Sequence, residues 1–536
     1  MTLKHWFKLS LLFWACIPIV TSAATPRPKL ILVVVFDQFR ADYLMRFESK
    51  FLPPHLPSGT EVGGFSWFMK TGAYFPYGEY EILQNMTGPG HATILTGSYP
   101  YQSGISLNYW FDPTTQKSVY CTEDPASPQI GGDSANPHNG TSPKLLHAST
   151  VGDELKNAGY NSKIVSVSIK DRAAILLGGH GADLALWYDP KARSWVSSKF
   201  YLPSGNLPAW VNSINEDFKK FEGKKVAWAS TGPNSFTHDF EFGTRPWIAT
   251  PGGSEMIATV ATRAFDELKL GQGPDTDLLA VSFSSHDYAG HDFGPNSREI
   301  EEMTIAEDRI LSKFLNHIGK KIPGGLSQVT LVLTGDHGVP PAAAWARAHK
   351  FDAGRIDEPA VAKAISDRLD IKFGKNTKSW VPFYGDLVFF LDEAEVASRG
   401  LDLAVVEAEA KSVAAKTDGV FQTFTRGEYI ARKLPPGLFE KQIMKGYYLG
   451  RSGNIVLIPK PYYTNSSHDA VDHLTGYTFD RTVPIIFAGF GIKTGQYAKH
   501  AKVVDIAPTL TYIAGAVPPN MSEGQVLKEA LKDLKK

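Results

Sequence analysis

Seven residues of the kinds that bind metal ions or attack esters stand out in this sequence. They are three aspartates, three histidines and one threonine: Asp37, Thr87, Asp287, His291, Asp336, His337 and His473. Carboxylate oxygens and imidazole nitrogens together suit zinc. Six such groups are enough for two ions, and two metal ions about 3.5–4 Å apart are a common device for holding a phosphoryl group during transfer. The set predicts a two-metal centre.

The spacing of these residues supports a shared site. Asp287 and His291 are four residues apart in Asp-Tyr-Ala-Gly-His, so one turn of the chain can direct both at one ion. Asp336 and His337 are adjacent, between an apolar run and Gly338. Each pair taken alone also fits an ordinary loop pair, so the prediction depends on the pairs meeting in space.

Thr87 is the candidate nucleophile. It is followed by Gly-Pro-Gly and then by a stretch with helical character. This order predicts a hydroxyl at a helix N-terminus, where free N–H groups and the helix dipole favour negative charge. Such a hydroxyl could attack an anionic centre. The alternative is that Thr87 only caps the helix.

Four apolar runs lead directly into these or similar polar residues: 30–36, 163–169, 278–283 and 329–333. Unbroken apolar runs are typical of parallel strands buried on both faces, and ligands collect at the carboxyl ends of such strands. Helical patterns over 151–158 and 298–318 lie between them. The sequence therefore predicts an α/β fold, with a mostly parallel sheet sandwiched by helices. Lys170 and Arg172 follow the second run, either as a solvated strand end or as phosphate contacts.

The rest of the chain predicts one catalytic domain with two insertions. A further strand is expected over 484–488 and a helix over 503–514. Residues from about 183 to 255 are rich in Trp, Pro, Gly and Ser and indicate an irregular insertion. Residues from about 340 to 450 contain a helical pattern over 403–415 and aromatic strands within 381–391, and we interpret them as a cap module. The single catalytic domain would span 24–536.

The N-terminus has the pattern of a signal peptide, residues 1–23. Lys4 and Lys8 precede an apolar run over 9–20, and small residues follow at 21–24. We therefore expect a periplasmic or secreted protein with no membrane span after cleavage. Of the two cysteines, Cys16 leaves with the signal, so the mature chain has no disulfide and no thiolate zinc site. Lys plus Arg equals Asp plus Glu at 55 each, which indicates no nucleic-acid partner.

Several motifs together resemble the alkaline phosphatase superfamily, and within it the type I phosphodiesterase/nucleotide pyrophosphatase group with a threonine nucleophile. They are Asp37, Thr87 before Gly-Pro-Gly, the Ser-x-x-Asp-x-x-Gly-His-x-x-Gly-Pro string over 284–295, Gly-Asp-His-Gly over 335–338, and Asp-Ile-Ala-Pro-Thr over 505–509. The resemblance implies one zinc ion on Asp37, Asp336, His337 and Thr87. It implies a second zinc ion on Asp287, His291 and His473.

Within that group, the chain resembles the exported, phosphate-irrepressible alkaline phosphatases. These carry an asparagine after the nucleophile and a Lys-x-Arg pair, which correspond here to Asn108, Lys170 and Arg172. A guanidinium and an ammonium can neutralise the extra oxygens of a monoester. One departure is His473-Leu-Thr-Gly where the family has His-Gly, which leaves His468 as an alternative ligand.

The resemblance implies an exported, zinc-dependent alkaline phosphatase. It would hydrolyse small-molecule phosphate monoesters through a phosphothreonine intermediate at Thr87. A phosphodiesterase or nucleotide pyrophosphatase on the same scaffold is the first alternative, and a non-catalytic exported metal-binding module is the second. A sulfatase is disfavoured because the Cys/Ser-x-Pro-x-Arg setting of its nucleophile is absent at Thr87.

Overall fold

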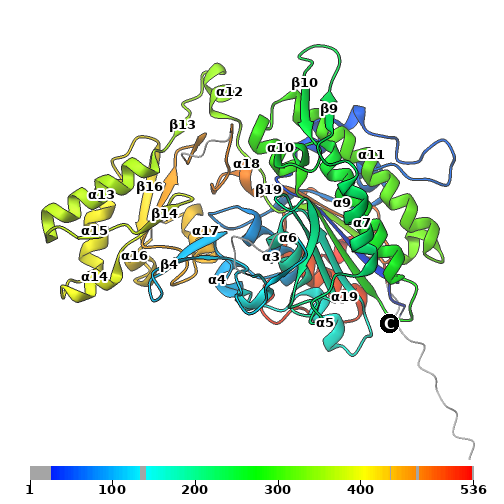
Figure 1. The fold of residues 1–536 in the computed structure, drawn as a ribbon, viewed down its shortest axis with the longest axis horizontal. Coiled ribbons are helices and arrows are strands. Elements are labelled where there is room, and N and C mark those ends of the chain that lie inside the picture. Colours follow the sequence, from blue (N-terminus) through cyan, green and yellow to red (C-terminus); the bar gives the residue numbers. More distant parts are fainter. Residues whose placement is uncertain (1–25, 133–139, 435, 466–469, 534–536) are drawn as a thin grey trace, which may run out of the picture.

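The computed structural model describes residues 26–132, 140–434, 436–465 and 470–533. The expected signal peptide, residues 1–23, lies outside the described residues. The chain forms a large domain around one sheet and a smaller module beside it (Figure 1).

The centre of the 11-stranded main sheet is parallel, as the apolar runs predict. Its parallel strands lie in the order β12 (Val329–Gly335), β1 (Leu30–Phe36), β11 (Asp277–Phe283), β6 (Ile164–Ser168) and β7 (Leu184–Asp189). Antiparallel strands extend it on both sides: β19 (Thr482–Gly489) and β2 (Ala73–Glu79) beyond β12, and β8 (Ser194–Ser198) beyond β7. The α/β fold with a mostly parallel sheet is confirmed.

Helices cover both faces of this sheet. The side chains of β1 alternate between two hydrophobic cores, with Leu32 and Val34 in one and Val33 and Val35 in the other. The first core includes α9 (Pro251–Leu268) and α11 (Arg298–Lys321). The second includes α3 (Thr87–Thr96), α5 (Val151–Asn157) and α19 (Ile506–Ala514). A strand buried on both faces has no polar alternation, which explains its unbroken apolar sequence.

The region from 183 to 255 is more regular than its composition suggests. Its first part supplies β7 and β8 to the main sheet. After α7 (Ala209–Lys219), a hairpin of β9 (Lys225–Ala229) and β10 (Thr237–Glu241) follows. The Trp228 ring of this hairpin lies 5.9 Å from that of Phe293, at the end of α10 (Ser285–Phe293). The hairpin therefore packs beside the helix that follows β11.

The module beside the main sheet has its own sheet and core. Its strands are β14 (Phe383–Gly385), β15 (Val388–Phe390), β17 (Ile455–Pro459) and β16 (Val420–Thr425), in that order. Helices α13 (Glu358–Phe373) and α15 (Leu403–Ala414) pack around a core that includes Trp380, Phe389 and Leu457. We call this the cap module; it extends past residue 450 to the end of β17.

Candidate active site

The carboxyl-terminal edge of the main sheet brings all seven candidate residues together. Asp37 follows β1, and Asp336 with His337 follows β12. Asp287 and His291 lie on α10, directly after β11. Thr87 begins α3, and His473 lies in the loop before α18 (Thr478–Arg481). Because β12, β1 and β11 are parallel neighbours, their polar end residues meet at one edge.

The first group contains buried atoms that lack hydrogen-bond partners. Asp37 Oδ1 and His337 Nε2 have none among the described residues, and Asp336 Oδ2 has only His91 Nδ1 within 3.1 Å. His337 Nε2 lies 3.5 Å from Asp37 Oδ1 and 3.4 Å from Asp336 Oδ2. Unpaired buried polar atoms are costly, and two carboxylate oxygens and one imidazole nitrogen are a donor set that suits zinc. These residues fit a cation.

The second group lies against the first. His291 Nε2 lies 3.2 Å and His473 Nε2 lies 4.0 Å from Asp287 Oδ1. The rings of His337 and His473 stack with centroids 3.8 Å apart. Asp287, His337 and His473 have ligand atoms within 4.8 Å of one another, so His337 borders both groups. His468, the alternative ligand, lies outside the described residues.

Backbone carbonyls fix the orientation of all three histidines. The Nδ1 atoms of His291, His337 and His473 pair with the carbonyl oxygens of Val471 (2.9 Å), Gly338 (2.9 Å) and Asn85 (2.5 Å). An Nδ1–H that donates to a carbonyl leaves Nε2 with its lone pair toward the site, which is the tautomer a metal needs.

The three histidines differ in the direction in which their surroundings shift their pKa values. Burial lowers the pKa of His337 to about 4, and burial together with His337 lowers the pKa of His473 to about 3. Both imidazoles are therefore neutral at pH 7. For His291, burial lowers the pKa, but the Asp287 carboxylate outweighs it and raises the pKa to about 10. Burial and the Asp336 carboxylate raise the pKa of Asp37 to about 6. A cation here would displace the proton on His291.

Thr87 makes no capping bond. Met86 holds the N-cap position of α3, without a side-chain hydrogen bond. The Thr87 hydroxyl instead accepts hydrogen bonds from Lys170 Nζ at 3.1 Å and Arg172 Nη2 at 3.3 Å. A Cβ atom at Gly90 would lie 2.4 Å from the Asp336 carbonyl oxygen, so glycine there lets α3 approach the end of β12. Lys170 also contacts Asp37 and Asp287, so it links the Thr87 hydroxyl to both groups of candidate ligands.

Three further residues surround Thr87 as predicted phosphate contacts. Lys170 precedes α6 (Asp171–Gly178), and its ammonium lies 2.7 Å from Asp37 and 2.6 Å from Asp287. Arg172 Nη1 also donates to Tyr120 Oη at 3.3 Å. Asn108 Oδ1 accepts from Gly88 N–H at 2.8 Å, which leaves its amide NH2 as a donor. Two cationic groups thus converge on the Thr87 hydroxyl, and the Asn108 amide lies at the next residue, Gly88.

Comparison with known proteins identifies the family. Residues 31–479 match the family described as Type I phosphodiesterase / nucleotide pyrophosphatase. The chain belongs to this family. Alkaline phosphatase PhoV of Synechococcus elongatus is 32% identical over 96% of this chain and 95% of its own. Alkaline phosphatase PafA of Elizabethkingia meningoseptica is 30% identical over 99% of this chain and 100% of its own.

Structures of PafA extend the likeness. A crystal structure of the wild-type protein has a TM-score of 0.84, with 29% identity over 95% of this chain and 100% of that one. A second carries substitutions of a threonine, an asparagine, a lysine and an arginine, spaced 21, 62 and 2 residues apart. A relative from Myroides odoratus, 30% identical over 96% of each chain, is named a calcium-transporting ATPase. Within the described part of the present chain, no helix has the length and apolar character to span a bilayer.

Gln38, which the sequence analysis did not single out, forms hydrogen bonds with two of the predicted metal ligands. The Gln38 N–H donates to Asp336 Oδ1 at 2.9 Å, and Gln38 Nε2 donates to Asp287 Oδ1 at 3.0 Å, so one residue links both groups. Its φ of 62° is in the left-handed region, which is uncommon outside glycine. Its position directly after Asp37, at a strand end, was the available signal.

His91 and Asp472 were also missed. His91 Nδ1 lies 2.9 Å from the Thr87 carbonyl oxygen and 3.1 Å from Asp336 Oδ2, and Nε2 lies 2.8 Å from Ser282 Oγ. Both ring nitrogens are occupied, so His91 orients Asp336. Its spacing of four from Thr87, on one helix face, was a signal. Asp472 lies within ligand distance of His291 and His473 and directly precedes the latter.

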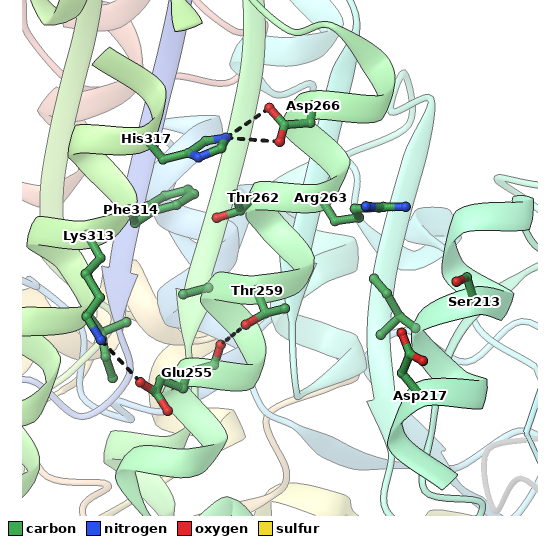
Figure 2. A pocket seen from close by; sticks show the side chains of 13 residues that line it. Ser213, Asp217, Glu255, Thr259, Thr262, Arg263, Asp266, Lys313, Phe314 and His317 are labelled. Atoms are coloured by element: carbon green, nitrogen blue, oxygen red, sulfur yellow. Dashed lines mark hydrogen bonds and ion pairs between the residues drawn. The ribbon is translucent and has the colours of Figure 1, made fainter. Parts of the chain in front are cut away.

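A groove elsewhere on the molecule has no connection with these residues. It has a volume of about 600 Å³ and lies between α7, α9 and α11 (Figure 2). Two pairs of its charged side chains contact each other: His317 Nε2 lies 2.9 Å from Asp266, and Lys313 Nζ lies 3.6 Å from Glu255. None of the predicted site residues lines it. The candidate catalytic and metal-binding residues lie together at the carboxyl-terminal edge of the main sheet instead.

Proposed function

We propose that the chain is an exported alkaline phosphatase that hydrolyses phosphate monoesters with two bound zinc ions. One observation carries the proposal. The Thr87 hydroxyl accepts hydrogen bonds from Lys170 and Arg172, and the same Lys170 ammonium contacts Asp37 and Asp287, one aspartate from each group of candidate ligands. Full-length relatives named alkaline phosphatases support the same conclusion.

The donor sets assign the residues that would hold the metals. Asp37, Asp336 and His337, with the Thr87 oxygen, would bind one zinc ion, and Asp287, His291 and His473 the other. When bound, zinc supplies Lewis acidity that lowers the pKa of a hydroxyl and stabilises a leaving oxygen. Gln38 and His91 keep the carboxylates in position.

The residues of the chain then perform the transfer. The Thr87 oxygen attacks phosphorus in line, the P–O bond to the leaving group breaks, and a phosphothreonine forms. Asn108, Lys170 and Arg172 donate to the non-bridging oxygens, whose charge they neutralise during the step. Water hydrolyses the phosphothreonine from the opposite side and regenerates the hydroxyl. Small-molecule phosphate esters are the substrates, and no nucleic-acid partner is required.

We call Asn108, Lys170 and Arg172 together the phosphate clamp. This clamp favours the hydrolysis of phosphate monoesters over that of diesters. A monoester dianion offers one more anionic oxygen than a diester, and Lys170, Arg172 and Asn108 supply donors for it. The four PafA substitutions involve the same residue types as Thr87, Asn108, Lys170 and Arg172, with the same spacings. This match supports equivalent roles. The N-terminal pattern over 1–23 supports export to the periplasm or medium.

Substrate comparison tests the function. The mature protein, purified with zinc, is assayed with phenyl phosphate, diphenyl phosphate and phenyl sulfate, and its metal content is measured. We expect two ions per chain and the highest kcat/KM for phenyl phosphate. A preference for the diester would favour the phosphodiesterase or nucleotide pyrophosphatase alternative. No turnover of any ester by metal-loaded protein would favour the non-catalytic module.

A further inference from the structure

The hairpin between β14 and β15 places an acidic residue in an unusual backbone conformation. Asp386 and Leu387 form its two-residue turn, with φ of 56° and 63°. Such turns need positive φ at both positions and usually contain Asn, Asp or Gly. A leucine there is unfavourable unless its surroundings impose it. The position of the turn is therefore fixed by contacts.

Those contacts come from inside the cap module. Leu387 is buried in the cap core. Its N–H donates to Glu358 Oε1 at 2.7 Å, and its carbonyl oxygen accepts from Leu457 N–H at 2.9 Å. Both the N–H and the carbonyl group of Leu387 are hydrogen-bonded, so the backbone position of the neighbouring Asp386 is fixed as well.

The outer side of the hairpin packs beside the phosphate clamp. Phe383 of β14 stacks on Phe111 of β3 (Tyr109–Asp112) with ring centroids 6.3 Å apart. Phe390 of β15 lies 6.2 Å from the same ring. Asn108 directly precedes β3, and Ile105, Trp110 and Tyr120 belong to the same hydrophobic cluster as these phenylalanines. The turn and the clamp are thus parts of one packed unit.

Charges that belong to the site act on the Asp386 carboxylate. They are Arg172, which donates to Thr87, and Asp472, which precedes His473. Burial, Asp472 and Glu358 raise the pKa of Asp386 to about 7, while Arg172 lowers it. Asp386 also acts on Tyr109, the residue after Asn108. Over the described ranges, no hydrogen bond or ion pair holds this carboxylate.

We propose that Asp386 is a specificity-determining residue that selects against phosphate esters whose leaving group carries its own negative charge. The inference rests on the proposed function. Lys170 and Arg172 are engaged by the charge of the scissile phosphoryl group, so a second anionic group on the leaving group would be repelled by the Asp386 carboxylate. Neutral and cationic leaving groups avoid this repulsion. Discrimination by an unfavourable charge is a common route to specificity.

The test is a matched substrate series with the zinc-loaded protein at about pH 9, where the carboxylate is ionised. Phenyl phosphate, its 4-carboxylate derivative and its 4-trimethylammonio derivative are compared in wild type and Asp386→Asn. Asparagine tolerates positive φ, so the turn is kept while the charge is removed. The measured quantity is the kcat/KM of each charged ester divided by that of phenyl phosphate. Asp367→Asn, on the exposed part of α13, is the control.

We expect Asp386→Asn to raise the ratio for the carboxylate ester about three- to tenfold and to lower that for the cationic ester, as Coulomb interaction across a half-solvated site predicts. Asp386→Gly, which also tolerates positive φ, should give the same shifts, and Asp367→Asn none. Unchanged ratios, or equal losses for all three esters, would overturn the proposal. Phenyl phosphate turnover by wild type tests the proposed function separately.

Discussion

The main sheet edge and the cap module hold their polar residues in different ways. At the sheet edge, buried candidate ligands are fixed by strand ends, backbone carbonyls and Gln38, and polar atoms such as Asp37 Oδ1 and His337 Nε2 have no hydrogen-bond partner within the described part of the chain. In the cap module, Asp386 is carried by a short turn that is anchored through Leu387 and Glu358. By our proposals, the first arrangement supplies the chemistry and the second selects the substrate. We therefore expect substitutions at the sheet edge to affect turnover of every ester, and substitutions in the cap turn to affect the choice among esters.

Substitution of the nucleophile should give the largest effect. Thr87→Ala removes the attacking oxygen, so we expect kcat for phenyl phosphate to fall by at least about three powers of ten and no phosphoenzyme to form. Metal content and the thermal midpoint should change little, because the aspartate and histidine ligands remain. Thr93→Ala, on the same helix with its hydroxyl bonded to the Pro89 carbonyl, is the control. Near-normal turnover by Thr87→Ala would contradict a nucleophilic role.

Removal of the two cationic clamp residues should reduce the preference for monoesters over diesters. Each charge-assisted contact contributes roughly 1.5–3 kcal/mol, or one to two powers of ten in rate. Lys170→Ala with Arg172→Ala should therefore lower monoesterase activity by several powers of ten and diesterase activity by far less, since a diester offers one fewer oxygen. Lys163→Ala, just before the same strand, is the control. Equal losses for both esters would favour the diesterase alternative.

Gln38 tests whether the sheet edge depends on its supporting residues. Gln38→Ala removes the donor to Asp287, and loss of such a support typically costs about 10- to 100-fold in metal affinity or activity. We expect activity to recover partly with excess zinc, and a chelator competition assay measures the affinity. Gln38→Gly removes the same side chain but accepts the positive φ. A much milder effect of Gln38→Gly would assign the loss to backbone strain instead.

Sequence reasoning located the ends of the central parallel strands for a physical reason. A parallel strand buried on both faces is an unbroken apolar run, so a polar residue directly after it, such as Asp37 or Asp336, is conspicuous. β7 and β8 were not predicted. They lie toward the margin of the sheet, in a region whose Trp, Pro and Gly content suggested an irregular insertion. The contacts of His91 depend on how α3 packs against β12. The hairpin that carries Asp386 is positioned by Phe383 and Phe390, which pack against Phe111 of β3, and no local sequence pattern encodes that contact.

The metal-free protein should become less stable as the pH rises. The folded-state pKa of His291 is raised to about 10 from 6.5. Its contribution to stability is fully present below pH 6.5 and is lost as the pH rises through 10. We therefore expect the thermal midpoint of the metal-free protein to fall by several degrees between pH 7 and pH 10, measured by calorimetry. His291→Gln should remove most of this fall. A flat profile in the metal-free wild type would contradict the assigned pairing with Asp287.

The smallest effect on catalysis should come from the anchor of the cap turn. Glu358→Ala leaves the buried Leu387 N–H without its acceptor, which costs about 1–3 kcal/mol, so the free energy of unfolding in urea should fall by that amount. Because the bond from Leu387 to Glu358 lies within the cap module, we expect phenyl phosphate kcat to change by less than about threefold. Asp367→Ala, an exposed position on the same helix, should change neither quantity. If Glu358→Ala instead lowered kcat as much as Gln38→Ala does, the cap turn would belong to the catalytic apparatus, and the division between a chemical sheet edge and a selective cap would fail.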